Sequence, residues 1–158
     1  MLENLITDRT LSDYLRWKEL RDKGLANMTA EERAEWDTDL KGAYNISDLN
    51  RVGSALNYLL GRLTSAGYLR GDEFSMPTAL TEYQDLTADT FSAYLSAVET
   101  IRGAMSQKTT TPPTPADVGG LDFQGANDIE KILLDVEELI NNMLLSRHYC
   151  GELFSGEI

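Results

Sequence analysis

The stretch KGAYNISDLNRVGSALNYLLGRLTSAGY, residues 41–68, carries the clearest helix signal in the chain. Asn45 is placed to cap a helix, with Asp48 three residues later as its capping-box partner. Gly67 supplies a left-handed stop. The apolar residues between these signals recur every three or four positions: Leu49, Val52, Leu56, Leu59, Leu60 and Leu63. The pattern predicts a buried central helix over residues 45–66.

Two shorter helices are predicted before the central one. Each begins at a capping box, in which a threonine faces an acid three residues later: Thr10 with Asp13, and Thr29 with Glu32. We expect the first helix to end at Gly24 and the second to run to Gly42. The apolar pattern of the first contains Leu11, Tyr14, Leu15 and Leu20. The two helices are expected to form a hairpin that leads into the central helix.

The chain after residue 68 alternates irregular segments with two further helices. Residues 69–86 lack periodicity, which predicts an ordered loop, and Thr87 precedes a helix that runs through about Met105. Residues 106–121 hold three of the four prolines and adjacent glycines, which predicts an extended strap. A last helix is expected over residues 122–146, with an apolar stripe of Ile129, Ile132, Val136, Leu139 and Met143.

These patterns predict one all-α domain over residues 1–158, with about five helices in an irregular bundle around the central helix. Residues 147–158 contain a short repeat, YCGEL followed by FSGEI. Because glycine disfavours helix, we expect residues 147–158 to form an extended tail. Its aromatic and aliphatic side chains either pack back on the domain or dock into a partner.

The net charge of −12 is unevenly distributed. Residues 1–70 hold ten Lys and Arg against eleven Asp and Glu, whereas residues 71–158 hold four against fifteen. An acidic half repels phosphate backbones, so we expect no direct nucleic-acid binding. It either keeps the protein soluble, or forms a docking face for a basic partner or a mimic of nucleic acid. The start, MLENLITDR, has no signal-peptide pattern, and no apolar stretch is long enough for a membrane span.

No sequence motif indicates catalysis, a cofactor or a metal site. Phosphate-binding loops and the GxSxG elbow are absent, and His148 is the one histidine. His148, Cys150 and Glu152 alternate, but no second pair of ligands accompanies them, as a zinc site would require. We therefore expect no catalytic, cofactor-binding or metal-binding residues, and no enzymatic activity.

Partner contacts are expected on three surfaces. On the central helix, Arg51, Tyr58 and Arg62 line up opposite the leucine stripe, as either a protein-contact surface or an ordinary solvated face. On the last helix, Leu134 and Leu145 lie on the flank away from its stripe. In the tail, the apolar candidates are Tyr149, Leu153, Phe154 and Ile158.

Gly53 interrupts the central helix at the edge of its stripe. A glycine there costs about 1 kcal/mol relative to alanine. We expect the close approach of another helix to compensate for it.

Several segments resemble a group of small proteins encoded by phages and prophages of Gram-positive bacteria. The resemblance lies in LITDRT, NMTAEERAEW, KGAYNISDLNRV and NDIEKILLDVEEL…YCGELFSGEI, which together span nearly the whole chain. The group tends to have tryptophan in the loop after Tyr68 and an aromatic pair before the final repeat. This chain has Phe74 and His148-Tyr149 instead.

The resemblance implies a structural or adaptor protein of a phage tail, located in the virion and made in the host cytoplasm. It implies protein–protein contacts with other virion proteins and no catalysis, and we expect a homo-oligomer because virion parts usually repeat around a symmetry axis. One alternative is a small acidic inhibitor, or a nucleic-acid mimic, that acts in the host cytoplasm. A glycan hydrolase is a third option, which would need facing carboxylates such as Glu137 and Glu138.

Overall fold

The computed structural model describes residues 2–38, 40–81, 87–116 and 121–152. Within these residues the chain is helical and contains no strand, which confirms the predicted all-α fold. Its elements are α1 (Leu11–Lys23), the short 3-10 helix η1 (Leu25–Asn27), α2 (Ala30–Trp36), α3 (Ile46–Ser65), α4 (Ala88–Gly103) and α5 (Phe123–Glu152).

The predicted helix starts are confirmed by their capping hydrogen bonds. Full capping boxes precede three of the helices: Thr10 with Asp13, Thr29 with Glu32, and Asn45 with Asp48. At the start of α4 the hydroxyl of Thr87 accepts a hydrogen bond from the backbone N–H of Thr90. Gly67 adopts a φ of 82°, the left-handed conformation expected after the central helix.

Two helices end earlier than their patterns predict. α4 stops at Gly103 instead of Met105, and α2 stops at Trp36 instead of reaching Gly42. The chain passes Asp13 so closely at Gly42 that a Cβ there would lie 2.0 Å from the Asp13 carbonyl oxygen. The segment after α2 therefore turns against α1 at Gly42.

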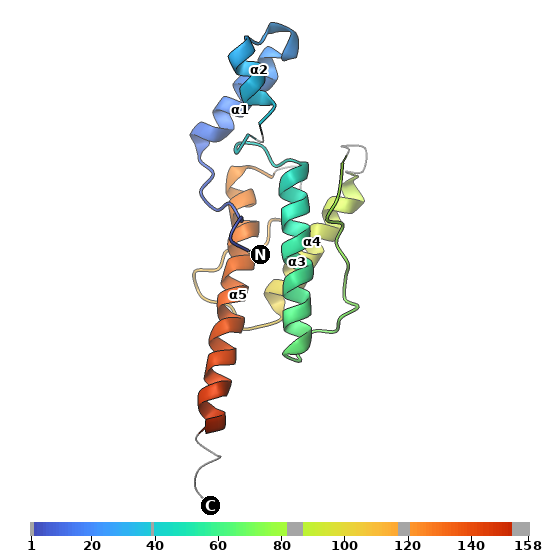
Figure 1. The fold of residues 1–158 in the computed structure, drawn as a ribbon, viewed down its shortest axis with the longest axis vertical. Coiled ribbons are helices and arrows are strands. Elements are labelled where there is room, and N and C mark those ends of the chain that lie inside the picture. Colours follow the sequence, from blue (N-terminus) through green and yellow to red (C-terminus); the bar gives the residue numbers. More distant parts are fainter. Residues whose placement is uncertain (1, 39, 82–86, 117–120, 153–158) are drawn as a thin grey trace, which may run out of the picture.

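α3 and α5 lie side by side and run in the same direction (Figure 1). Three hydrogen-bonded pairs join them with a constant offset of 79 residues: Arg51 with Glu130, Tyr58 with Glu137, and Arg62 with Asn141. A constant offset means that both helices advance together. Parallel neighbours need long return connections, which residues 66–87 and 104–122 supply on either side of α4.

The core lies where α3, α4 and α5 pack against one another. The predicted leucine stripe of α3 is buried, and Val98 and Ile101 of α4 are fully buried against it. α5 contributes a row of buried residues: Ile129, Ile132, Leu133, Val136 and Ile140. α3 is therefore the central helix of the domain, as its sequence predicts.

The strap was predicted over residues 106–121, and its described part, residues 106–116, lies against α5. Thr111 donates a hydrogen bond to Asp135 at 2.9 Å, and Lys108 pairs with Glu138 at 2.6 Å. The Nε of Arg102 donates to the carbonyl of Pro112 at 2.9 Å. These contacts attach the strap to the helices on both sides of it.

The prediction that residues 147–158 form an extended tail is wrong for its first six residues. α5 continues to Glu152, well past the lower end of α3 (Figure 1). One glycine at position 151 costs about 1 kcal/mol, which lowers helix stability without ending a 30-residue helix. Residues 153–158 lie outside the described residues.

The expected close neighbour of Gly53 is present: the nearest atom belongs to a loop, and a side chain of the neighbouring helix α4 comes next. A Cβ at Gly53 would lie 2.3 Å from the carbonyl oxygen of Pro77 and 3.0 Å from the hydroxyl of Tyr94. That hydroxyl also donates to the Pro77 carbonyl at 2.9 Å. The loop backbone therefore rests directly on the helix where the side chain is missing.

Candidate functional site

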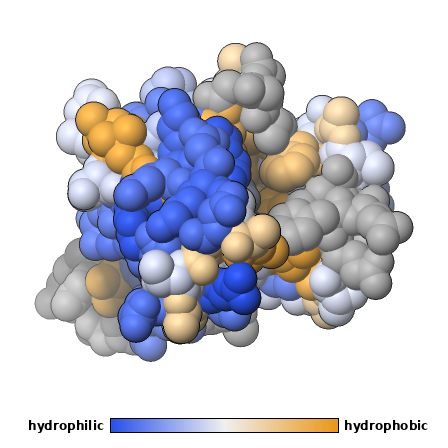
Figure 2. All heavy atoms as spheres, turned by 90° about the horizontal axis from the view of Figure 1, so that it is seen from above, coloured by the Kyte–Doolittle hydropathy of each residue, from blue (hydrophilic) through white to orange (hydrophobic). Residues whose placement is uncertain are grey.

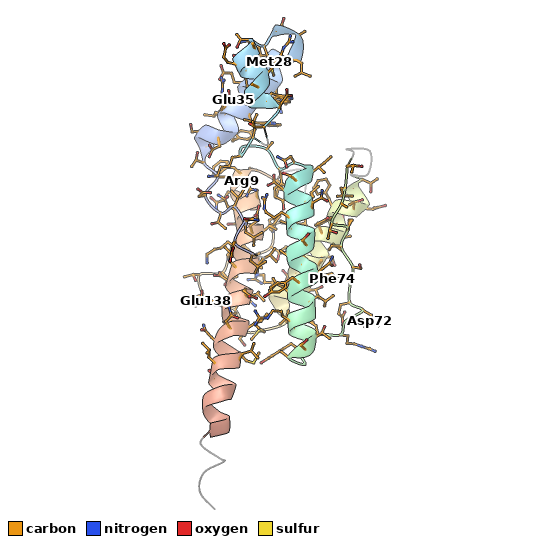
Figure 3. The ribbon with its side chains drawn as sticks, in the orientation of Figure 1. Arg9, Met28, Glu35, Asp72, Phe74 and Glu138 are labelled. Carbon is orange, nitrogen blue, oxygen red and sulfur yellow. The ribbon has the colours of Figure 1, made fainter. Side chains whose placement is uncertain are left out.

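Four charged residues form the buried ion cluster of this protein: Arg9, Asp48, Arg51 and Glu130. Arg9 donates to Asp48 at 2.9 Å and to Glu130 at 2.7 Å. Arg51 donates to both Glu130 oxygens, at 3.0 and 3.2 Å, and pairs with Asp48 as well. Figure 3 labels Arg9, which precedes α1 and lies beside the upper parts of α3 and α5. The cluster thus joins three separate parts of the chain.

Further hydrogen bonds fix the N-terminal segment to α5. The backbone N–H of Arg9 donates to the side chain of Asn127 at 3.0 Å, and that side chain donates back to the Arg9 carbonyl at 2.9 Å. The backbone N–H of Ile6 donates to Glu130 at 2.6 Å. Residues that are 118 or more positions apart in sequence are held together in this way.

The cluster is balanced in charge, with two arginines facing two carboxylates. Burial opposes the charged form of Arg51, but its hydrogen bonds and charge attraction to Glu130 and Asp48 raise its pKa overall. Burial, together with the negative charges of Glu130 and Asp48, raises the pKa of the nearby Tyr44 well above its usual value. Glu130 is fully buried. These charges hold the helices together, because the ion pairs link the N-terminal segment, α3 and α5.

A second polar group joins the lower halves of α3 and α5. Arg62 donates to Glu137 at 2.5 Å and to Asn141 at 3.0 Å. Tyr58 donates to the same Glu137 at 3.2 Å. These bonds repeat, two helical turns further on, the link that Arg51 makes with Glu130.

The prediction that Arg51, Tyr58 and Arg62 form an outer face of the central helix is wrong. All three bond to α5, which covers that side of α3. The sequence held a usable signal, since the seven-residue spacing of Arg51 and Tyr58 matches that of Glu130 and Glu137. Contact of these three side chains with an external partner stays a prediction. Their bonds to α5 leave fewer of their polar atoms available for such a contact.

The two leucines predicted on the flank of the last helix have different environments. Leu134 is partly buried and packs against the core, so its predicted exposure is wrong. Leu145 is 58% exposed, as expected, and its neighbour Leu144 is 43% exposed. The side chain of Tyr149, and all of Leu153, Phe154 and Ile158, lie outside the described residues.

The distal part of α5, residues 144–152, extends beyond the bundle. With the 79-residue offset, Ser65 at the end of α3 lies level with Leu144. Eight further residues of helix add about 12 Å beyond that point. An exposed helix end that carries leucines is suited to contact another protein.

Among the described residues, no three His, Cys, Asp or Glu side chains gather as a metal site would need. The side chains of His148, Cys150 and Glu152 lie outside the description. Glu137 and Glu138, the carboxylates considered for glycan hydrolysis, bond in different directions: one to Arg62 on α3, the other to Lys108 in the strap. No helix in the described part of the chain has the length and apolarity to cross a membrane.

Arg9 and Glu130, which anchor the ion cluster, were not singled out as functional residues from the sequence. No pattern in a single sequence links positions 121 residues apart. Comparison of the chain with protein-family models, with curated proteins and with solved structures found no match. The function is therefore inferred from the residues and contacts described above.

Proposed function

We propose that this chain is a structural or adaptor protein of a phage tail or related particle. It works through contacts with other virion proteins and with copies of itself, and performs no catalytic step. The observation that carries the proposal is the distal part of α5, which extends past α3 with Leu144 and Leu145 exposed. The resemblance of several segments to phage tail-module proteins suggests that these contacts are made in a phage tail.

The arrangement of charge inside the domain supports a structural role. The best-buried carboxylates, Asp48, Glu130 and Asp135, each have a basic partner in the same chain. Buried pairs of this kind favour one arrangement of the helices over others, as a rigid building block needs. The exposed surface is then left for partners.

The alternative is an acidic inhibitor that mimics nucleic acid. Such a mimic needs its carboxylates spread along one solvent-facing surface, like phosphates. Glu130 and Asp135 from the acidic half are buried instead, and Glu137 is engaged by Arg62. The inward use of these three acids favours the structural role.

Deletion of the gene from the phage or prophage that carries it tests the proposal. We expect the mutant to yield particles with missing or incomplete tails in electron micrographs, and expression of the wild-type chain to restore them. An inhibitor of a host process would instead leave particle assembly intact. Normal tails in the deletion mutant would therefore contradict the structural role.

A further inference from the structure

An aromatic pocket lies at the end of the molecule that carries the hairpin. The cavity has a volume of about 230 Å³, and five aromatic side chains line it: Tyr14, Trp17, Tyr44, Phe91 and Phe123. They come from α1, the turn before α3, α4 and the first turn of α5. All five are partly exposed. The pocket is therefore an open apolar hollow built by four segments of the chain.

The surface beside the pocket is apolar as well. On α1, Leu11 lies three positions from Tyr14 and four from Leu15, so these side chains are neighbours on the helix surface. Leu11 and Leu15 are 55% and 52% exposed. Figure 2 views this end and shows hydrophobic residues beside a hydrophilic central part. Partly exposed aromatic residues and leucines around a hollow are typical of a protein contact surface.

The opposite end of the molecule carries a matching convex feature. The distal part of α5 projects there with Leu144 and Leu145 exposed. Residues 139–151 contain no aspartate or glutamate, although the chain has 26 of them, and Arg147 is the basic residue of that segment. An exposed rim residue of the pocket, Asp122, has the opposite charge. Arg9, the other charged residue of the lining, is buried and already paired with Asp48 and Glu130, so Asp122 is the charge that the pocket presents to a partner. The helix end thus suits the pocket in both hydrophobicity and charge.

The helix end of one molecule is too far away to reach the pocket of the same molecule. Phe123 in the pocket and Leu145 on the projection belong to the same helix, α5. Leu145 lies 22 positions after Phe123, which spans about 33 Å at 1.5 Å per residue. A continuous helix cannot fold back on its own first turn, so the occupant belongs to another molecule.

We propose that the aromatic pocket receives the distal part of α5 of a second copy, so that copies associate end to end. Within the described part of residues 71–138, the three basic residues are partly buried, whereas six acids are exposed: Asp72, Glu73, Asp89, Glu99, Asp122 and Glu138. Side-by-side packing of these faces therefore brings acidic surfaces together. End-to-end contact avoids this repulsion. Because each copy offers a pocket at one end and a helix at the other, the contact is heterologous and builds rings or filaments.

This inference deepens the proposed function by naming the self-contact, and it is tested on purified protein without any particle. Sedimentation velocity is measured over a range of concentrations for the wild-type chain, for Leu145→Glu as the helix-end variant and for Trp17→Glu as the pocket variant. Leu11→Glu is a second pocket-side variant, since its exposed side chain is not required for folding. Tyr68→Glu, which changes an exposed aromatic side chain that belongs neither to α5 nor to the pocket lining, is the matched control.

The wild-type and Tyr68→Glu chains are expected to form larger species as concentration rises. Each of the other variants alone is expected to lose association by about tenfold or more, the effect of one interface hot spot. An equimolar mixture of Leu145→Glu with Trp17→Glu or Leu11→Glu should then form a 1:1 dimer and stop. In that dimer the intact helix end of the pocket variant fills the intact pocket of the helix-end variant.

Three results would overturn the inference. A wild-type chain that stays monomeric at every concentration has no such contact. Helix-end to helix-end pairing would let the pocket variants associate alone, with no new species on mixing. Association that survives all the variants lies elsewhere on the surface. A chain that associates as proposed but is absent from particles would keep this inference and refute only the virion role.

Discussion

At the scale of single residues, the domain depends on charges that are fully removed from water. Arg9 and Glu130 are 3% and 0% exposed. Each is stable there because the two arginines and two carboxylates of the buried ion cluster pair with one another, with the Nε of Arg9 left without a hydrogen bond. A buried pair of this kind contributes little relative to an apolar pair, but losing one partner leaves a costly unpaired charge.

Replacing Glu130 with Gln tests that reasoning. The change keeps the side-chain shape but removes the charge that faces Arg9 and Arg51, so we expect a loss of about 3–5 kcal/mol in the free energy of unfolding. Urea denaturation measures it. The matched control is Glu138→Gln, whose carboxylate is 60% exposed and pairs with Lys108, with an expected effect below about 1 kcal/mol. Equal effects of the two changes would show that the cluster does not anchor the fold.

Two glycines of α3 provide a second test at this scale. Gly53→Ala places a methyl group 2.3 Å from the Pro77 carbonyl oxygen, and relieving that clash should cost about 1–3 kcal/mol. Gly61→Ala meets no atom within 4 Å and should stabilise the helix by up to about 1 kcal/mol. Thermal unfolding therefore should shift downward for the first and upward for the second. Two upward shifts would mean that the loop does not rest on Gly53.

At the scale of elements, the α1–α2 hairpin is the part with the least apolar support. Leu20 is the one residue of α1 that is buried. Ion pairs join the two helices instead: Arg16 with Glu35 at 2.5 Å, and Lys23 with Glu32 at 2.6 Å. These pairs are partly exposed, so salt screens them. We expect the hairpin to open under conditions that leave the three-helix core intact.

The pH dependence of the hairpin follows from its glutamates. Hydrogen bonds from Lys23 lower the pKa of Glu32, and hydrogen bonds from Arg16 lower the pKa of Glu35. A lowered pKa in the folded state gives stability above the ordinary glutamate pKa of 4.5 and loses it as the pH falls through the lowered value. Amide chemical shifts should show α1 and α2 unfolding first on acidification. Simultaneous loss of all the helices would contradict this.

The sequence predicted most elements because their signals are local. Capping boxes and the three-and-four spacing act within one or two turns, so Asn45, Asp48 and the leucines of α3 could be placed from sequence alone. The end of α2 could not, because the sequence offers its glycine stop at Gly42, whereas the helix ends at Trp36. Arg51 was predicted on the outer face of α3, but α5 covers that face and Arg51 bonds to Glu130 there. The apolar pattern of one helix does not show which other helix will pack on it.

At the scale of the whole molecule, the sequence predicts the connecting strap but not which distant helices pack together. The strap over residues 106–121 was identified from its prolines, but the parallel order of α3 and α5 follows from contacts 79 residues apart. The attachment of Arg9 to Asn127 spans 118 residues. Such pairings depend on the packed fold, and no local signal in one sequence specifies them.

The molecule that results has an aromatic pocket near its hairpin end, and a helix, α5, that projects at the other end (Figure 1). Its inner charges are used to hold the helices, and its exposed leucines lie towards the two ends. This form suits a repeated part of a larger assembly.

Quantitative mass spectrometry of purified phage particles tests the central claim most directly, that this chain is a structural part of a virion. The account predicts recovery of the chain in a fixed ratio to known tail proteins, retained when the particles are washed in high salt. Particles that lack the chain, from cells in which it is abundant, would contradict the claim and favour the acidic inhibitor.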